Sequence, residues 1–122
     1  MTTTKFIGAI PVIPSGDIER DLKWYNEQAG FDTAFVADGY AGLSRENIHL
    51  HLQWHAGTEE DPLLGGSVVK VFVENIQPLF NELVERRTVS ADALRKTAWQ
   101  TTEFGFYDLN KNAIFFVEVN VG

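Results

Sequence analysis

Residues 102–119, TEFGFYDLNKNAIFFVEV, contain two runs rich in β-forming and aromatic residues, separated by a turn. The first run places Phe104 and Phe106 at alternating positions, and the second run extends from Ile114 to Val119. Between them, Asn110-Lys111-Asn112 is typical of a tight turn, because Asn tolerates left-handed backbone conformations. This pattern predicts a β-hairpin that closes the domain.

Composition predicts one globular domain over residues 1–122, without a membrane span. The net charge of −7 disfavours nucleic acid and anionic membranes as partners. A cationic small molecule is a more suitable partner, although the charge could also serve solubility alone. The chain has no cysteine, which excludes disulfides and thiolate zinc sites. Together with the lack of a signal-peptide pattern, this composition indicates a cytoplasmic protein.

The chain contains a weak internal repeat, with modules at about residues 1–56 and 65–122. The first module opens with a predicted strand from Phe6 to Ile13 and a helix from Asp17, its N-cap, to about Ala29, which Gly30 is expected to end. The second opens with a strand at 67–73, and Asn75 is expected to cap the helix that follows. The apolar stripes of the two helices superpose at one constant offset: Ile18, Leu22 and Tyr25 on Ile76, Phe80 and Leu83.

Three strands are expected after each helix. Asp38-Gly39 is a two-residue hairpin signal between strands at 31–37 and 40–44. Residues 48–55, IHLHLQWH, alternate strictly, so that one face is apolar and the other carries histidine and glutamine. Residues 88–100 are expected to form an irregular loop or a short strand leading to Trp99. The predicted fold is therefore α+β: two βαβββ modules, each a curved mixed sheet with its helix outside, around a concave cleft.

Several motifs resemble the glyoxalase/bleomycin-resistance (vicinal oxygen chelate) superfamily. Residues 9–31, AIPVIPSGDIERDLKWYNEQAGF, are similar to its opening strand and first helix, and residues 108–112 replace a turn that usually reads Asp-Pro-x-Gly-Asn. Lys111 replaces glycine there and is expected to take a positive φ. Further motifs resemble the bleomycin-binding branch: Ala9-Ile10-Pro11-Val12, Asp38-Gly39-Tyr40-Ala41-Gly42, and Trp99 shortly before Glu103-Phe104.

The resemblance also identifies where metal enzymes of the superfamily carry their ligands. These positions fall on Ile10, Val68 and Phe115, none of which can coordinate a cation, and on His49, which can. His49 and His51 share a strand face, but His55 lies about 13 Å beyond His51 at ~3.3 Å per residue. The sequence thus favours a metal-free protein without cofactors. The alternatives are a diverged metal-dependent glyoxalase- or dioxygenase-like enzyme that uses His49, and a protein that binds an unidentified small metabolite.

No covalent or nucleotide-dependent chemistry is indicated by the remaining residues. The sequence has neither a cysteine nor a Gly-x-Ser-x-Gly elbow, and it has no phosphate-binding loop or dinucleotide fingerprint. We therefore assign no catalytic residue and expect a binding protein rather than an enzyme.

The resemblance implies a homodimer that sequesters a bleomycin-like or other cationic aromatic compound in clefts at its interface. Bleomycin combines a planar bithiazole with a positive tail, which aromatic walls and carboxylates would bind. The expected ligand-binding residues are Tyr40, His51, Gln53, His55, Trp99 and Asp38, with residues 59–61 extending the negative rim. Tyr40 and Trp99 could instead be packing residues, and Trp24 and Trp54 are assigned to core or interface packing. Near Pro11 the N-terminal strand is expected to cross to the partner, giving a segment-exchanged dimer.

Overall fold

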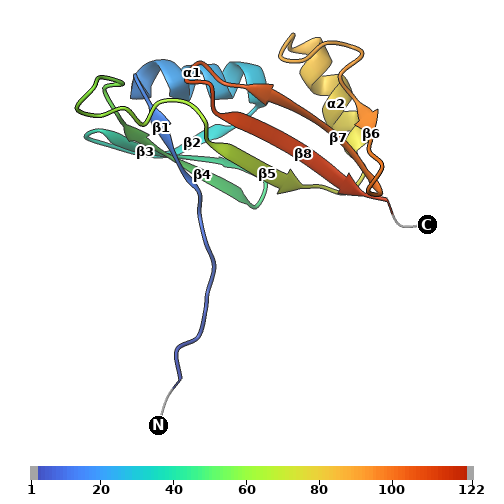
Figure 1. Ribbon diagram of the computed structural model, residues 1–122, viewed down its shortest axis with the longest axis horizontal. Coiled ribbons are helices and arrows are strands. Elements are labelled where there is room, and N and C mark those ends of the chain that lie inside the picture. Colours follow the sequence, from blue (N-terminus) through green and yellow to red (C-terminus); the bar gives the residue numbers. More distant parts are fainter. Residues whose placement is uncertain (1–2, 121–122) are drawn as a thin grey trace.

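The computed structural model describes residues 3–120, which form two helices and two sheets (Figure 1). The elements in chain order are β1 (Val12–Ser15), α1 (Ile18–Ala29), β2 (Asp32–Ala37), β3 (Tyr40–Arg45), β4 (Ile48–Trp54), β5 (Val68–Phe72), α2 (Ile76–Glu85), β6 (Arg95–Lys96), β7 (Thr101–Tyr107) and β8 (Ala113–Val119).

The two sheets have the same strand order, which confirms the predicted α+β fold of two βαβββ units. Sheet 1 has the order β1-β4-β3-β2, and sheet 2 has the order β5-β8-β7-β6. In each sheet the first and last strands of the unit pair in parallel, and the other pairs are antiparallel. The hairpin of 102–119 is β7–β8, and the short strand expected within 88–100 is β6.

The helix and turn predictions hold at three positions and fail at one. Asp17 accepts a hydrogen bond from the Arg20 amide at 3.1 Å, as an N-cap should, and Lys111 has a φ of 65° as expected. Gly30 ends α1 in the left-handed conformation. Asn75 occupies the N-cap position of α2, but its side chain makes no capping bond. The Ile76 amide donates instead to Oε1 of Glu118 at 2.9 Å, because β8 ends beside α2.

The first strand is shorter than the prediction of Phe6 to Ile13. Only β1 at Val12–Ser15 pairs with β4, and residues 3–11 form an extended arm that leaves the body of the molecule (Figure 1). Phe6 and Ile7 on this arm are 93% and 95% exposed. A strand needs a neighbour for its backbone hydrogen bonds, and residues 3–10 meet none within the described chain. The β-forming residues of the arm therefore have no neighbouring strand within one described copy of the chain.

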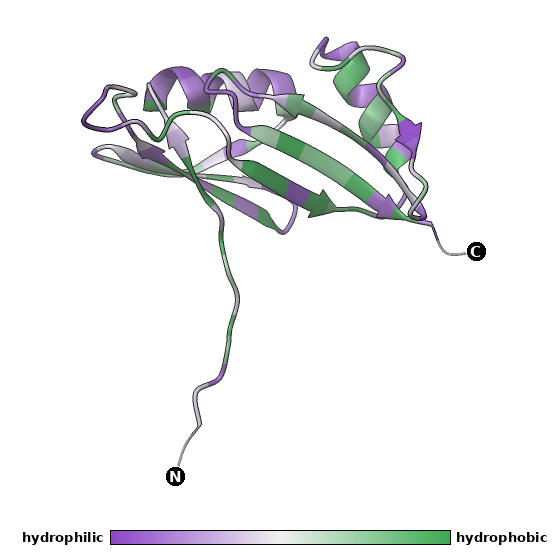
Figure 2. Cartoon of the chain, in the orientation of Figure 1, coloured by the Kyte–Doolittle hydropathy of each residue, from purple (hydrophilic) through white to green (hydrophobic). Residues whose placement is uncertain are grey.

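Both helices pack on one side of the sheets, and a single core joins the two units (Figure 1). Trp24 of α1 packs against Phe106 of β7 with ring centroids 5.6 Å apart, so α1 reaches across to sheet 2. Hydrophobic residues are concentrated along β5 and β8 (Figure 2). Trp54 is 51% exposed, so it does not belong to the core, and interface packing remains the prediction for this residue. No helix within residues 3–120 is long and apolar enough to cross a membrane.

A buried polar junction also connects the two units, and nothing in the sequence patterns indicates it. Asp21 of α1 accepts hydrogen bonds from Ser15 at 2.5 Å and from the Asn110 amide group at 2.6 Å. The hydroxyl of Tyr25 donates to Asp108 at 2.7 Å. Burial and the Asp108 charge raise the pKa of Tyr25 above its ordinary value, so the phenol remains a donor. Asp108 also accepts hydrogen bonds from two backbone amides of the β7–β8 turn, which explains why an aspartate stands at the start of this turn.

A second connection is an ion pair at the surface between β3 and α2. Arg45 donates two hydrogen bonds to Glu82, at 2.7 and 2.8 Å, and one to the carbonyl of Ala29 at 2.7 Å. The Arg45 guanidinium lowers the pKa of the Glu82 carboxyl. The pair thus ties the end of α1, strand β3 and helix α2 together.

Candidate functional site

The outer face of sheet 1, opposite the helices, carries the polar side chains of β4. Leu50 and Leu52 of this strand are buried in the core, so His49, His51 and Gln53 lie on the other face. The cross-strand register then fixes their neighbours on β3. His51 lies beside Gly42, and Gln53 lies beside Tyr40.

Tyr40 and His51 are brought together as predicted, with a third residue that sequence reasoning missed. The Tyr40 hydroxyl is 2.8 Å from Nδ1 of His51. Phe35 of β2 stacks on Tyr40 with centroids 6.2 Å apart and planes at 20°, and its ring meets His51 edge-on at 5.1 Å. Phe35 is 42% exposed. These residues form an accessible aromatic surface, the Phe35–Tyr40–His51 cluster.

Gly42 makes room for the Phe35 ring. A Cβ atom at Gly42 would lie 2.2 Å from Cε1 of Phe35, closer than any two carbon atoms approach without bonding. The ring therefore lies directly over the glycine backbone. A glycine opposite an aromatic residue on a neighbouring strand is the sequence signal that could have identified Phe35 as part of the surface.

Two other predicted site residues, His55 and Asp38, lie outside the cluster. His55 Nδ1 is 2.7 Å from Oδ1 of Asp61, and Asp61 also accepts the Ala56 amide at 3.1 Å. The hydrogen bond from His55 lowers the pKa of Asp61. His55 thus closes the turn after β4 instead of extending the row of His51. Asp38 lies in the β2–β3 turn, beside a shallow surface hollow that it lines together with Trp54.

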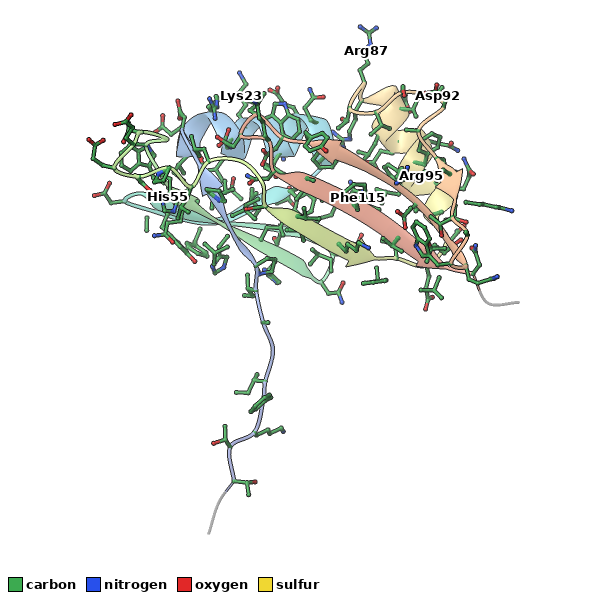
Figure 3. The ribbon with its side chains drawn as sticks, in the orientation of Figure 1. Lys23, His55, Arg87, Asp92, Arg95 and Phe115 are labelled. Carbon is green, nitrogen blue, oxygen red and sulfur yellow. The ribbon has the colours of Figure 1, made fainter. Side chains whose placement is uncertain are left out.

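Trp99 lies far from Tyr40 along the molecule. It is 65% exposed in the segment between β6 and β7 of sheet 2. In Figure 3, Arg95 of β6 and His55 after β4 mark opposite ends of the structure. One copy of the chain therefore does not bring the two expected aromatic walls together.

The superfamily metal-ligand positions can now be compared between the two units. Parallel pairing sets Val12 beside His51 in sheet 1 and Lys70 beside Phe115 in sheet 2. The helix offset equates Val12 with Lys70, so within the repeat Phe115 corresponds to His51, and His49 corresponds to Ala113. Among residues 3–120, no group of three or more His, Cys, Asp or Glu side chains is placed to hold a metal ion.

No family model matches the sequence. Bleomycin resistance proteins of Geobacillus stearothermophilus and Staphylococcus aureus are 23% identical over 125 residues, which cover 90% of this chain and 95% of theirs. Among solved structures, the bleomycin resistance determinant encoded on transposon Tn5 has a TM-score of 0.81 at 18% identity, with 95% of this chain and 100% of that chain covered.

Two further solved structures have similar folds. The bleomycin-binding protein of Streptomyces verticillus, in complex with copper(II)-bleomycin, has a TM-score of 0.77 at 21% identity, covering 98% of this chain and 99% of that chain. A glyoxalase/bleomycin resistance protein/dioxygenase from Nocardioides has a TM-score of 0.76 at 16% identity, covering 99% and 88%. The chain thus has homologues among bleomycin resistance proteins and shares the fold of the glyoxalase/bleomycin resistance/dioxygenase superfamily.

Proposed function

We propose that this protein binds a bleomycin-like or other cationic aromatic compound and sequesters it without chemical change. The observation that carries the proposal is the Phe35–Tyr40–His51 cluster on the open face of sheet 1. Aromatic side chains held in place by a hydrogen bond offer a flat surface on which a planar heteroaromatic group stacks. The net charge of −7 favours a ligand with a positive tail.

The side chains at the superfamily's ligand positions support a metal-free site. Ile10, Val68 and Phe115 carry no atom that donates an electron pair to a divalent cation. His51, which the repeat matches with Phe115, is hydrogen-bonded through Nδ1 to Tyr40. The side chains at these positions therefore suit a binding surface better than a catalytic metal centre.

The complete site requires a second copy of the chain. Trp99 and Tyr40 belong to opposite ends of one copy, so a cleft with both as walls forms only between two copies. Residues 9–11, 47–50 and 69–72 line a cavity of about 360 Å³ between the edges of β4 and β5. An extended arm from a second copy could add a strand there, burying Phe6 and Ile7. We infer a segment-exchanged homodimer with two clefts.

Calorimetric titration with metal-free and copper-loaded bleomycin near neutral pH tests this proposal. We expect one ligand per subunit for the wild type and loss of binding in Trp99→Ala. Trp54→Ala is the matched control, because Trp54 is a comparably exposed tryptophan whose strand position faces the helix side of sheet 1. Absence of binding to either form of bleomycin, or equal loss in both variants, would contradict the proposal.

A further inference from the structure

Phe115 lies on the outer face of sheet 2, in the middle of β8. Its neighbours Ile114 and Phe116 are buried in the core, so alternation directs Phe115 to the opposite face, where it is partly exposed (Figure 3). In the internal repeat Phe115 corresponds to His51. An aromatic ring therefore stands in sheet 2 where sheet 1 carries a member of the Phe35–Tyr40–His51 cluster.

The ring of Phe115 lies over a glycine, as the ring of Phe35 does in sheet 1. Gly105 is its register partner on β7, and a Cβ there would lie 2.5 Å from Cδ1 of Phe115. Because Gly42 and Gly105 occupy matching places in the repeat, each sheet combines a central glycine with a phenyl ring across it. Phe115 thus lies against backbone on the side of Gly105, and its partial exposure leaves the ring accessible to a ligand.

The surroundings of Phe115 favour a planar group whose positive end lies toward β7, because Lys70, the register partner of Phe115 on β5, is a cation on the other side of the ring. In the next register row of the same face lie Phe72, which is exposed, and Glu103, whose carboxylate is buried. Glu103 accepts a hydrogen bond from Thr101 at 3.0 Å, and its distance to Arg95 is 3.7 Å. An apolar surface with a carboxylate beside it attracts the same class of compound as the aromatic cluster of sheet 1.

We propose that Phe115 is a second stacking residue, which binds a planar part of the same ligand and contributes to its selection. This inference rests on the proposed function. A cleft closed by sheet 1 of one copy and sheet 2 of the other has an aromatic surface on each side. The ligand class is a flat, unsaturated compound with at least one aromatic ring system, and its positive group lies toward the β7 side of Phe115.

Titration of Phe115→Leu and Phe115→Tyr with metal-free bleomycin tests the inference. Leucine keeps the apolar bulk and removes the ring, so we expect Kd to rise by about 3- to 10-fold. Tyrosine keeps the ring and should bind within about twofold of the wild type. Aromatic protons of the ligand should shift upfield in NMR spectra with the wild type and the tyrosine variant, and less with the leucine variant. Urea unfolding verifies that both variants fold.

The outcomes separate this inference from the proposed function. Wild-type binding that is lost in Trp99→Ala but unchanged in Phe115→Leu would overturn the role of Phe115 alone. An equal loss in the leucine and tyrosine variants would also overturn it, because the ring would then not be the cause. Failure of the wild type to bind bleomycin would overturn both.

Discussion

Replacing the two apolar side chains Phe6 and Ile7 on the N-terminal arm should weaken association between copies of this chain. Phe6 and Ile7 are almost fully exposed in one copy, and burial of such a side chain contributes about 1.5–3 kcal/mol. Two residues on one arm therefore amount to about 3–6 kcal/mol, and a symmetric dimer buries two arms.

Ordering of the arm opposes this gain. Fixing the backbone of these two residues costs about 1 kcal/mol each, which leaves a net gain of about 1–4 kcal/mol for each arm. When the double variant Phe6→Ser/Ile7→Ser releases its arms, that cost is recovered. We therefore expect the double variant to lose about 3 kcal/mol of dimerisation free energy, near the low end of the net gain for two arms. This loss raises the dimer dissociation constant about 100-fold.

Sedimentation velocity over a range of micromolar concentrations measures this change. The wild type should be dimeric, and the double variant should dissociate within the range. Lys5→Ser is the matched control, since Lys5 lies on the same arm and is also exposed but contributes no apolar side chain. A wild type that stays monomeric, or a double variant that associates as tightly as the wild type, would refute the role of the arm.

Three further predictions concern the site and the junction between the units. Tyr25→Phe leaves the buried Asp108 with one donor fewer and should lower the free energy of urea unfolding by about 2 kcal/mol; an unchanged midpoint would show that the bond contributes nothing. Gly42→Ala should turn the Phe35 ring aside, costing about 1 kcal/mol of stability and reducing bleomycin affinity in calorimetry, whereas unchanged affinity would remove the cluster from the site. In the folded protein the pKa of Glu82 lies below its ordinary 4.5, so its contribution to stability is present above pH 4.5 and is lost as the pH falls through the folded pKa. Glu82→Gln should therefore be less stable than the wild type at neutral pH. Thermal unfolding should show the two proteins becoming equally stable in acid.

The elements with a strong local pattern could be predicted from the sequence. Both hairpins follow from turn residues between alternating strands, and α1 follows from its N-cap Asp17 and its terminating Gly30. The division into two βαβββ units was also predicted, whereas the strand order within each sheet came only from the structure. The cap of α2 was wrong because Asn75 takes a left-handed conformation and its side chain makes no capping bond, while Glu118, more than 40 residues away, accepts the hydrogen bond of the Ile76 amide.

The candidate site was predictable only in part. Tyr40 and His51 were identified from a motif and from strand alternation, and they do contact each other. Phe35 was missed because its place in the cluster depends on the register between β2 and β3 and on the space over Gly42. His55 was misplaced because its partner, Asp61, lies in a loop without a periodic pattern.

The sequence by itself determined the hydrophobic periods, the turns and the N-cap of α1, and hence most of the helix and strand segments and the apolar face of each. These properties depend on interactions within a few residues. Only the tertiary structure decided which polar groups form hydrogen bonds between the two units, such as Asp21 and Asn110, which lie 89 positions apart. It also decided that residues 3–10 find no strand partner within one copy. Such pairings depend on the three-dimensional packing of distant segments, and no local period records them.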